Sequence, residues 1–336
     1  MSLSRRSFLA STACVTASAA AGAIATRALT STLPAHAAQG NPVIIDTHQH
    51  LWNLERLQLP WLQGAPAVLK RSYNPEDYAE ATRGLDVRAV YMEVDVDTTD
   101  HDKEAKYVTD LCQSAGSQTI AAVIGGRPAA DQFGAYIKRH LASGKVRGVR
   151  QVLHNAGDPA GQCLADAFVR GVRLLGDNGL MFDLCMRPGE LRDGIRLSEL
   201  CPDTRFVLDH CGNADVKAFH ASLRGDRPAS HDIEAWKRDI AAFAQRPNVV
   251  CKISGIVASA PAGWKTEHLA PIVNHCLDAF GPDRVVFGGD WPVCLLGSPY
   301  RGWVDALTEI IASRPETDRQ KLWSGNARGI YQLAGA

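Results

Sequence analysis

The chain has 336 residues, a length that suits one large α/β barrel domain. Hydrophobic residues make up 46% of it and charged residues 21%, as in folded globular proteins, so an intrinsically disordered chain is excluded. The 36 basic and 36 acidic residues balance to zero net charge, which excludes a polybasic nucleic-acid-binding protein. We therefore expect a small-molecule partner and no nucleic acid.

The first 37 residues predict a cleaved export leader. Residues 4–9, Ser-Arg-Arg-Ser-Phe-Leu, resemble the twin-arginine consensus and precede an apolar stretch that is poor in charge. This stretch ends at the small-x-small site Ala35-His36-Ala37, where we expect cleavage. A membrane anchor is the alternative, but Arg27 and several hydroxyl residues make the stretch a poor span. We expect a periplasmic or secreted protein, without stable membrane insertion, whose domain spans residues 38–336.

Short apolar runs alternate with longer helical patterns eight times after the leader. Continuous apolar runs are typical of strands covered on both faces, so they predict a parallel sheet, and eight strand-helix units predict a single-domain (β/α)₈ TIM barrel. The expected strands are Val43–Asp46, Val87–Val94, Ile120–Ile124, Val146–Val152, Met181–Cys185, Arg205–Leu208, Val249–Ile253 and Arg284–Phe287. The expected helices include Asp102–Ala115, Ala160–Asp177, Asp232–Gln245 and Leu269–Phe280.

A doubly wound open sheet is the competing fold. It would usually carry a glycine-rich phosphate-binding turn after its first strand, where this chain has Asp46-Thr47-His48-Gln49-His50. The sequence also has no GxGxxG or GxxxxGKS/T pattern between an expected strand and helix. The barrel is therefore favoured, and on it the long segment Asn213–His231 would lie at the catalytic rim as a candidate lid.

Of the nine cysteines, Cys14 belongs to the leader. The other eight show no CxxC or Cys/His spacing of the kind that a zinc site or a redox pair requires. We expect separate buried thiols, several of them in strands. An oxidising periplasm would permit disulfides, but the sequence determines no pairing.

Histidines and an aspartate follow three expected strands, at positions that a barrel brings to a common mouth. His48 and His50 end the first strand, and strand alternation sends both imidazoles to one side, although such a pair is also found in ordinary polar packing. His210 follows the sixth strand and Asp290 the eighth. Burying ionisable groups there is costly, which favours catalytic roles. Asp290 could accept a proton from water while His210 polarises a carbonyl group.

Two arginines near this mouth are candidate ligands for a carboxylate or for hydroxyl groups. Arg150 lies in the fourth expected strand, and Arg187 follows the fifth. A guanidinium group can bind a carboxylate through two parallel hydrogen bonds. Each arginine could equally form an ordinary ion pair within the fold, so both interpretations stay open.

Six segments, in this order along residues 43–331, resemble the lactonase branch of the amidohydrolase superfamily. That branch includes L-fuconolactonase, L-rhamnonolactonase and 2-pyrone-4,6-dicarboxylate lactonase. The motifs are specific for the branch and less so for any one substrate. The segments are Asp46–Trp52, Pro60–Leu62, Gly148–Gln151, Asp209–Gly212, Pro247–Gly255 and Gly289–Pro292.

The resemblance implies hydrolysis of a five- or six-membered lactone by a water molecule that the eighth-strand aspartate activates. By position this aspartate is Asp290, and the histidines that surround the carbonyl group are His48, His50 and His210. The resemblance also makes substrate contacts of two further residues, Glu93 and His154. Trp52, Trp61 and Trp291 could offer apolar faces to a sugar ring, or simply pack.

The metal prediction depends on a missing histidine. Metal-dependent members of the superfamily add a histidine at the end of the fifth strand, where this chain reads Met-Phe-Asp-Leu-Cys-Met-Arg over residues 181–187. A binuclear site is therefore not expected, whereas one weakly held zinc on His48, His50 and Asp290 is compatible with the sequence. As the lactonase resemblance implies, no cofactor should be required.

Two rival functions stay open. One is a metal-dependent amidohydrolase or decarboxylase on the same barrel, which would want the missing histidine. The other is a periplasmic sugar-acid binding protein without catalysis, for which a buried base would have little use. Few arginines stand near the mouth, which favours a neutral sugar lactone over a dicarboxylate. The oligomeric state is not determined by the sequence.

Overall fold

Eight parallel strands follow one another around a barrel in the computed structural model, which describes residues 42–155 and 157–333. The predicted leader lies outside the described residues. The strands are β1 Val43–Gln49, β2 Asp86–Met92, β3 Thr119–Gly125, β4 Val146–Leu153, β5 Met181–Met186, β6 Phe206–Leu208, β7 Val249–Ile253 and β8 Val285–Phe287. Each strand pairs in parallel with the next one along the chain, so the predicted barrel fold is confirmed.

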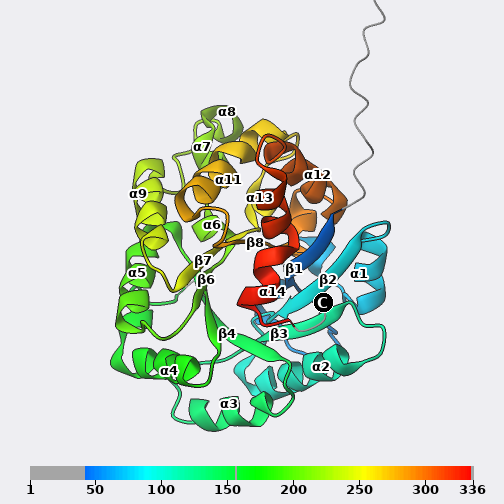
Figure 1. The fold of residues 1–336 in the computed structure, drawn as a ribbon, viewed down its shortest axis with the longest axis vertical. Coiled ribbons are helices and arrows are strands. Elements are labelled where there is room, and N and C mark those ends of the chain that lie inside the picture. The colour runs from blue at the N-terminus through cyan, green and yellow to red at the C-terminus, as the bar shows by residue number, and fades with distance from the viewer. Residues whose placement is uncertain (1–41, 156, 334–336) are drawn as a thin grey trace, which may run out of the picture. The chain divides into compact units, whose positions relative to one another are not determined.

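Helices surround the strands on the outside of the barrel (Figure 1). The helices of the described residues, including short ones at the two ends of the barrel, are α1 Pro75–Ala81, α2 His101–Gln113, α3 Phe133–Leu141, α4 Asp166–Asp177, α5 Leu191–Leu200, α6 His210–Asn213, α7 Val216–Phe219, α8 Ala221–Arg224, α9 Ile233–Ala244, α10 Ile256–Ser259, α11 Thr266–Phe280, α12 Tyr300–Ile310, α13 Glu316–Gln320 and α14 Asn326–Ile330. The segment predicted as a lid, Asn213–His231, contains the short helices α7 and α8.

The predicted helix Ala160–Asp177 was placed too early in the chain. It was expected from Ala160, but α4 begins at Asp166. Gly161 adopts a left-handed backbone conformation with φ 71°, which an α-helix cannot contain, and only a short 3₁₀ turn follows it. The strand positions agree with the prediction to within one or two residues, except that β1 continues to Gln49, three residues beyond its predicted end at Asp46.

The barrel closes between β1 and β8 just beyond the end of β8. The amide of Asp290 donates to the carbonyl of His48, and the amide of His50 donates to the carbonyl of Trp291, both at 2.8 Å. Two predicted site segments are thereby held together by the same main-chain bonds that complete the barrel. Closure and site geometry are therefore coupled.

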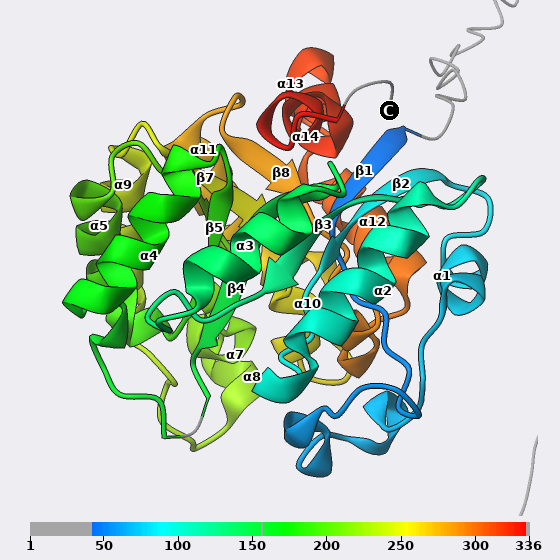
Figure 2. The same cartoon turned by 90° about the horizontal axis from the view of Figure 1, so that it is seen from below.

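Apolar side chains fill the amino-terminal half of the barrel interior. Ile45, Val90, Val207 and Val250 pack there against Tyr331, which follows α14. Figure 2 shows α13 and α14 at this end of the barrel and α7 and α8 at the opposite end. The chain's last described residues therefore cover the amino ends of the strands, and the carboxyl ends are left to form the site.

Candidate active site

A layer of charged side chains lies above the apolar interior. Strand alternation brings Asp183, Asp209 and Lys252 to the inside of the barrel, each two residues after an interior apolar residue of the same strand segment. All three are fully buried. Burying charge in a barrel is costly unless the charges are paired, and these three lie in one ion-pair network.

A cavity of about 400 Å³ opens at the carboxyl ends of the strands. Asp290 lies in its wall together with many of the residues predicted from the sequence. His48 is fully buried and is not among the lining residues, so it lies behind the cavity surface. The predicted residues that line the cavity are His50, Trp52, Trp61, Arg150, His154, His210 and Asp290.

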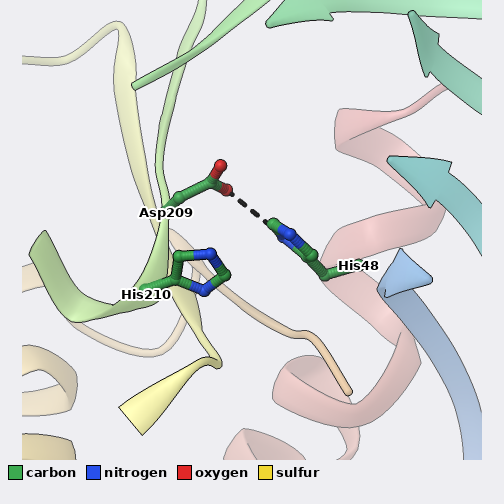
Figure 3. A group of neighbouring side chains, drawn as sticks. All are labelled: His48, Asp209 and His210. Carbon is green, nitrogen blue, oxygen red and sulfur yellow. Dashed lines mark ion pairs between the residues drawn. The ribbon is translucent and has the colours of Figure 1, made fainter. Parts of the chain in front are cut away.

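The imidazoles and the carboxylate gather around His48. His48 Nε2 lies 3.7 Å from Asp290 Oδ1, and His50 Nε2 lies 3.4 Å from the same oxygen. The ring of His210 is 4.4 Å from that of His48, centre to centre. Figure 3 shows His48, His210 and Asp209 facing one another, with Asp209 Oδ1 3.5 Å from His48 Nδ1. The four residues predicted to be catalytic are therefore neighbours.

Two of these residues have strained backbones. His210 has φ 55° and Asp290 has φ 54°, in the left-handed region that non-glycine residues rarely adopt. Such strain persists only where the surrounding structure enforces it, and it clusters at functional sites. For Asp290 the enforcing contacts are its amide bond to His48 and the bond from the Cys294 amide to its carbonyl at 2.7 Å.

The histidines are held in defined orientations by their neighbours. His50 Nδ1 lies 2.9 Å from the carbonyl of Met92, so this nitrogen carries the proton and donates it. His210 Nδ1 lies 2.9 Å from the hydroxyl of Ser254. Burial lowers the pKa of His210 and lowers the pKa of His48 well below its ordinary value, with Lys252 adding to the effect on His48. Neutral imidazoles suit both proton transfer and polarisation of a carbonyl group.

Lys252 is the buried cation beneath the histidines. Its Nζ lies 2.8 Å from Asp183 Oδ2 and 2.9 Å from Asp209 Oδ1. Burial opposes its charge, but the two aspartates hold the pKa of Lys252 above its usual value. Burial also disfavours the charge on Asp209, yet Lys252 and His48 hold the pKa of that carboxyl well below its usual range. Burial raises the pKa of Asp183 to about 7 in spite of Lys252.

Arg150 is the second buried cation. Its Nε donates to Glu93 Oε1 at 2.6 Å and its Nη2 donates to the Glu93 carbonyl at 2.8 Å. Its Nη1 lies 3.4 Å from Asp209 Oδ2. Burial opposes the charge of Arg150, but Glu93 above all holds its pKa well above the usual value. Behind this pair, burial and the nearby Glu93 raise the pKa of Glu104 to about 8.

Substitution Glu104→Gln is expected to flatten the pH dependence of stability. Between pH 4.5 and about 8 the folded protein keeps a proton on Glu104 that the unfolded chain has lost, so stability falls as pH rises through this window. Glutamine has no such proton to lose. As pH rises through this window, the free energy of unfolding of the native protein should fall, relative to that of the variant, by up to about 1.4 kcal/mol per pH unit. Urea unfolding at pH 5, 6.5 and 8 measures this, and parallel profiles for the two proteins would contradict it.

Substitution Gly255→Ala is expected to lower kcat about 100-fold because it displaces His210. A loss of this size is what a misplacement of about 1 Å in an active site can cause. Gly255 has φ 70°, and an added Cβ would lie 2.2 Å from His210 Nδ1. Gly263 has φ 78° with open space around it, so Gly263→Ala introduces comparable backbone strain without the collision. Steady-state kinetics of both variants test the idea, which fails if they lose the same activity.

One metal ion fits the first-strand histidines and Asp290. A tetrahedral zinc site with bonds of about 2.1 Å has donor atoms about 3.4 Å apart. His48 Nε2 and His50 Nε2 lie 3.7 and 3.4 Å from Asp290 Oδ1, and these donor atoms lie within 4.8 Å of one another. A second group of His48, Asp209 and His210 meets the same criterion, but Lys252 already faces its carboxylate. The first group is the better metal site.

Three residues predicted to contact the substrate do not line the cavity, namely Glu93, Arg187 and Trp291. Glu93 is fully buried behind Arg150, which separates it from the cavity. Arg187 is not among the lining residues, because its guanidinium group is engaged by Glu190 at 2.9 Å and by the Asn155 carbonyl at 2.6 Å. The sequence could not show these local partners.

Trp291 likewise lies outside the cavity lining. Its ring is buried and packs edge-on against Tyr73 and Tyr78, at centroid distances of 5.2 and 5.4 Å. It therefore presents no open face to a sugar ring. Trp52 and Trp61 do line the cavity and pack against each other at 5.8 Å.

Several cavity residues were missed by the sequence reasoning. Asp95, Asn155 and Asn213 line the cavity. Asp95 and Asn213 have positive φ values of 48° and 53°, and such strained backbone conformations cluster at functional sites. Lys252 was missed although its sequence carries a usable signal, because a lysine inside an apolar strand run indicates a paired interior charge.

The eight described cysteines are all free and buried. The expectation of buried thiols is confirmed for this part of the chain, with Cys185 in the cavity wall. They are not all separate, because the thiols of Cys211, Cys251 and Cys276 contact one another. Among the described residues, no helix is long and apolar enough to cross a membrane.

A (β/α)₈ barrel whose strand ends gather three histidines and an aspartate is the architecture of a hydrolytic enzyme of the amidohydrolase type. The chain belongs to the amidohydrolase family, whose model matches residues 45–333. The resemblance predicted from the sequence segments is thereby confirmed at the level of the family.

Curated relatives and solved structures agree with this assignment. L-fucono-1,5-lactonase of Burkholderia multivorans is 29% identical over 299 residues, covering 86% of this chain and 96% of that protein. L-fucono-1,5-lactonase of Burkholderia ambifaria is 26% identical over 302 residues, covering 86% and 95%. A crystal structure of a Burkholderia multivorans amidohydrolase with bound zinc is 27% identical, with a TM-score of 0.74, and covers 87% of this chain and 99% of that one.

Proposed function

We propose that this protein hydrolyses a neutral sugar-acid lactone with Asp290 as the base. The observation that carries the proposal is a cavity in which the Asp290 carboxylate lies against His50 at 3.4 Å, with His210 in the same wall. Two relatives named L-fucono-1,5-lactonase, which this chain matches over nearly their full lengths, support the substrate class.

The reaction assigns one task to each group. Asp290 takes a proton from water as the water oxygen attacks the lactone carbonyl carbon. The Ser254 hydroxyl contacts His210 at Nδ1, so the other ring nitrogen, Nε2, can stabilise the developing oxyanion. When the ring C–O bond breaks, the proton held by Asp290 passes to the leaving oxygen, and the product is an open hydroxy acid. His50 holds the attacking water against Asp290.

The charge around the cavity favours a neutral substrate. Arg150 is the one lysine or arginine among the described lining residues, and Glu93 and Asp209 already pair with it. Asp95 and Asp290 add negative charge to the wall. A dicarboxylate would meet no unpaired guanidinium group in this cavity lining, whereas sugar hydroxyls find Asp95, Asn155 and Asn213.

The proposed reaction requires no metal. The fifth strand presents Asp183, which pairs with Lys252, and Cys185, where metal-dependent members of the superfamily carry a histidine. A lactone also needs less activation than an amide. Where zinc binds, His48, His50 and Asp290 would hold it, and it would supply Lewis-acid polarisation of the carbonyl group.

The test is a pH-indicator assay of the purified protein over a panel of aldono-1,4-lactones, aldono-1,5-lactones and pyrone dicarboxylate lactones, with and without chelator. We expect turnover of a neutral sugar lactone that survives chelation. Turnover only after zinc addition, on an amide or a carboxylated aromatic compound, would favour the metal-dependent amidohydrolase or decarboxylase. Ligand binding without turnover would favour the non-catalytic binding protein.

We also propose that the enzyme acts outside the inner membrane. The support is the twin-arginine stretch at residues 4–9 and the cleavage motif at residues 35–37. The substrate would then be a lactone released by sugar oxidation or polysaccharide breakdown in that compartment. Cell fractionation tests this proposal, which fails if the protein is found only in the cytoplasm with residues 1–37 still attached.

A further inference from the structure

Hydrogen-bond donors in the cavity wall are directed at acceptors of the protein itself. Outside the catalytic residues, the tryptophan, asparagine and serine side chains of the described wall each direct an N–H or O–H group at a main-chain carbonyl or a carboxylate, at 2.6 to 3.0 Å. The pairs are Trp52 with Arg71, Trp61 with Val94, Asn155 with Asp95, Asn213 with Met186, and Ser259 with Ile256. A ligand in this cavity therefore meets few side-chain donors that are available to it.

The orientation of two amide groups in this wall is decided by their neighbours. Asn155 Nδ2 lies 2.8 Å from a carboxylate oxygen of Asp95, and Asn213 Nδ2 lies 2.9 Å from the carbonyl of Met186. An ionised carboxylate and a carbonyl can only accept, so both amides must turn their NH₂ groups toward these partners. The other atom of each amide, Oδ1, accepts no hydrogen bond from the described residues. Both side chains line the cavity, so their carbonyl oxygens are acceptors for a ligand.

Asp95 is the third acceptor of this wall. Its backbone has φ 48°, and its amide donates to Glu93 Oε2 at 2.7 Å, which holds this strained conformation in place. Its carboxylate contacts Arg127 at 3.3 Å and Asn155 at 2.8 Å, but a carboxylate has about four lone-pair sites. Arg127 does not line the cavity and balances the charge of Asp95 from behind, so a cationic ligand is not required.

The other nitrogen donors of the wall do not change this pattern. Arg150 is only 4% exposed, and each of its three guanidinium nitrogens contacts Glu93 or Asp209. His154 as a neutral ring adds one N–H group and one lone pair. His210 belongs to the reacting end of the cavity. Away from that end, acceptors of the wall outnumber the donors that a ligand can use.

We infer that Asp95, Asn155 and Asn213 form a subsite that selects the substrate by hydroxyl groups that donate to it. The inference rests on the proposed function for the lactone ring, and it goes further because it specifies what the ring must carry. An ether, keto, ester or carboxylate oxygen in this place would meet another acceptor and leave both without a hydrogen. The substrate is therefore a lactone whose hydroxyl groups on the side of these three residues are unsubstituted.

The test is the binding of ring compounds that cannot be hydrolysed. Calorimetric titration of the unmodified protein uses a panel of 1,5-anhydroalditols, which have the ring and hydroxyl groups of an aldono-1,5-lactone but no carbonyl group. Derivatives of the tightest binder then have a single hydroxyl group replaced by fluorine, which is close to a hydroxyl in size but cannot donate. Affinity should fall about 10-fold for at least one derivative. Equal affinity of all derivatives, or no binding by any anhydroalditol, would overturn the inference.

The variant Asn213→Gly links this loss to the subsite. Asn213 has φ 53°, which glycine adopts without strain, so the substitution removes the amide acceptor and leaves the backbone conformation accessible. At least one derivative that binds more weakly than its parent to the unmodified protein should bind the variant as tightly as its parent does, because the acceptor is already lost. Unchanged discrimination against every derivative would overturn the role of Asn213.

Gln332→Gly is the matched control. Gln332 is exposed, has φ 49° and follows α14 at the end of the barrel opposite the cavity, so this variant should keep the full discrimination. The titrations need no turnover. Weaker binding of fluorinated derivatives without hydrolysis of any lactone would remove the proposed function and leave the subsite. Hydrolysis of lactones with equal binding of all derivatives would do the reverse.

Discussion

Substitution Asp290→Asn is expected to lower kcat about 100- to 10,000-fold, the range for loss of a general acid-base group, with KM changed much less. The amide has nearly the shape of the carboxylate, so the backbone contacts of Asp290 with His48 and Cys294 should survive. It cannot take a proton from water. Since only the transition state depends on that transfer, the loss should fall on kcat.

The matched control is Asp95→Asn, which neutralises another carboxylate of the same cavity wall. Asp95 pairs with Arg127 at 3.3 Å and accepts from Asn155 Nδ2 at 2.8 Å. Its loss should raise KM more than it lowers kcat. Equal kcat losses in the two variants would show that cavity charge, rather than proton transfer at Asp290, limits the reaction.

The fold was predictable because its signal is local and repeated. Each barrel strand is covered on both faces, so each appears in the sequence as a continuous apolar run that can be recognised by itself. The positions of His48, His210 and Asp290 followed from the same regularity, since residues after parallel strands share one end of the barrel. No knowledge of their mutual distances was needed.

Partners that come from distant segments were not predictable. Arg187 resembled a substrate ligand because it follows a strand, yet the main-chain carbonyl of Asn155, 32 residues earlier in the chain, accepts a hydrogen bond from it. Trp291 follows the same rule, but the tyrosines of a distant segment cover its ring. The interior charge layer is the reverse case. Lys252 and Asp183 are visible in their strands, but their pairing depends on the barrel register, which no single strand encodes.

Substitution Arg150→Met is expected to destabilise the folded protein by about 3–5 kcal/mol, the cost of removing one partner of a buried ion pair. Glu93 is fully buried and receives two hydrogen bonds from Arg150, one on its carboxylate and one on its carbonyl. Without the guanidinium group, the carboxylate of Glu93 would lie unpaired near Glu104. A typical domain is stable by about 5–15 kcal/mol, so the loss would be a large share.

The double variant Arg150→Met/Glu93→Gln distinguishes lost pairing from lost packing. It removes both charges of the pair and leaves the Glu93 carbonyl and Asp209 Oδ2 unsatisfied, as Arg150→Met alone does. It should therefore be more stable than Arg150→Met alone by more than about 1 kcal/mol, because Glu93 no longer carries a charge. Unfolding in guanidinium chloride gives the free energy of unfolding of the native protein and of each variant, provided that their m-values agree. Equal stability of the two variants would mean that Arg150 supports the site by filling space. If the double variant is the more stable one, the main role of the Arg150 guanidinium group is to neutralise the Glu93 carboxylate behind it. Arg150 then has little charge to offer an anionic substrate.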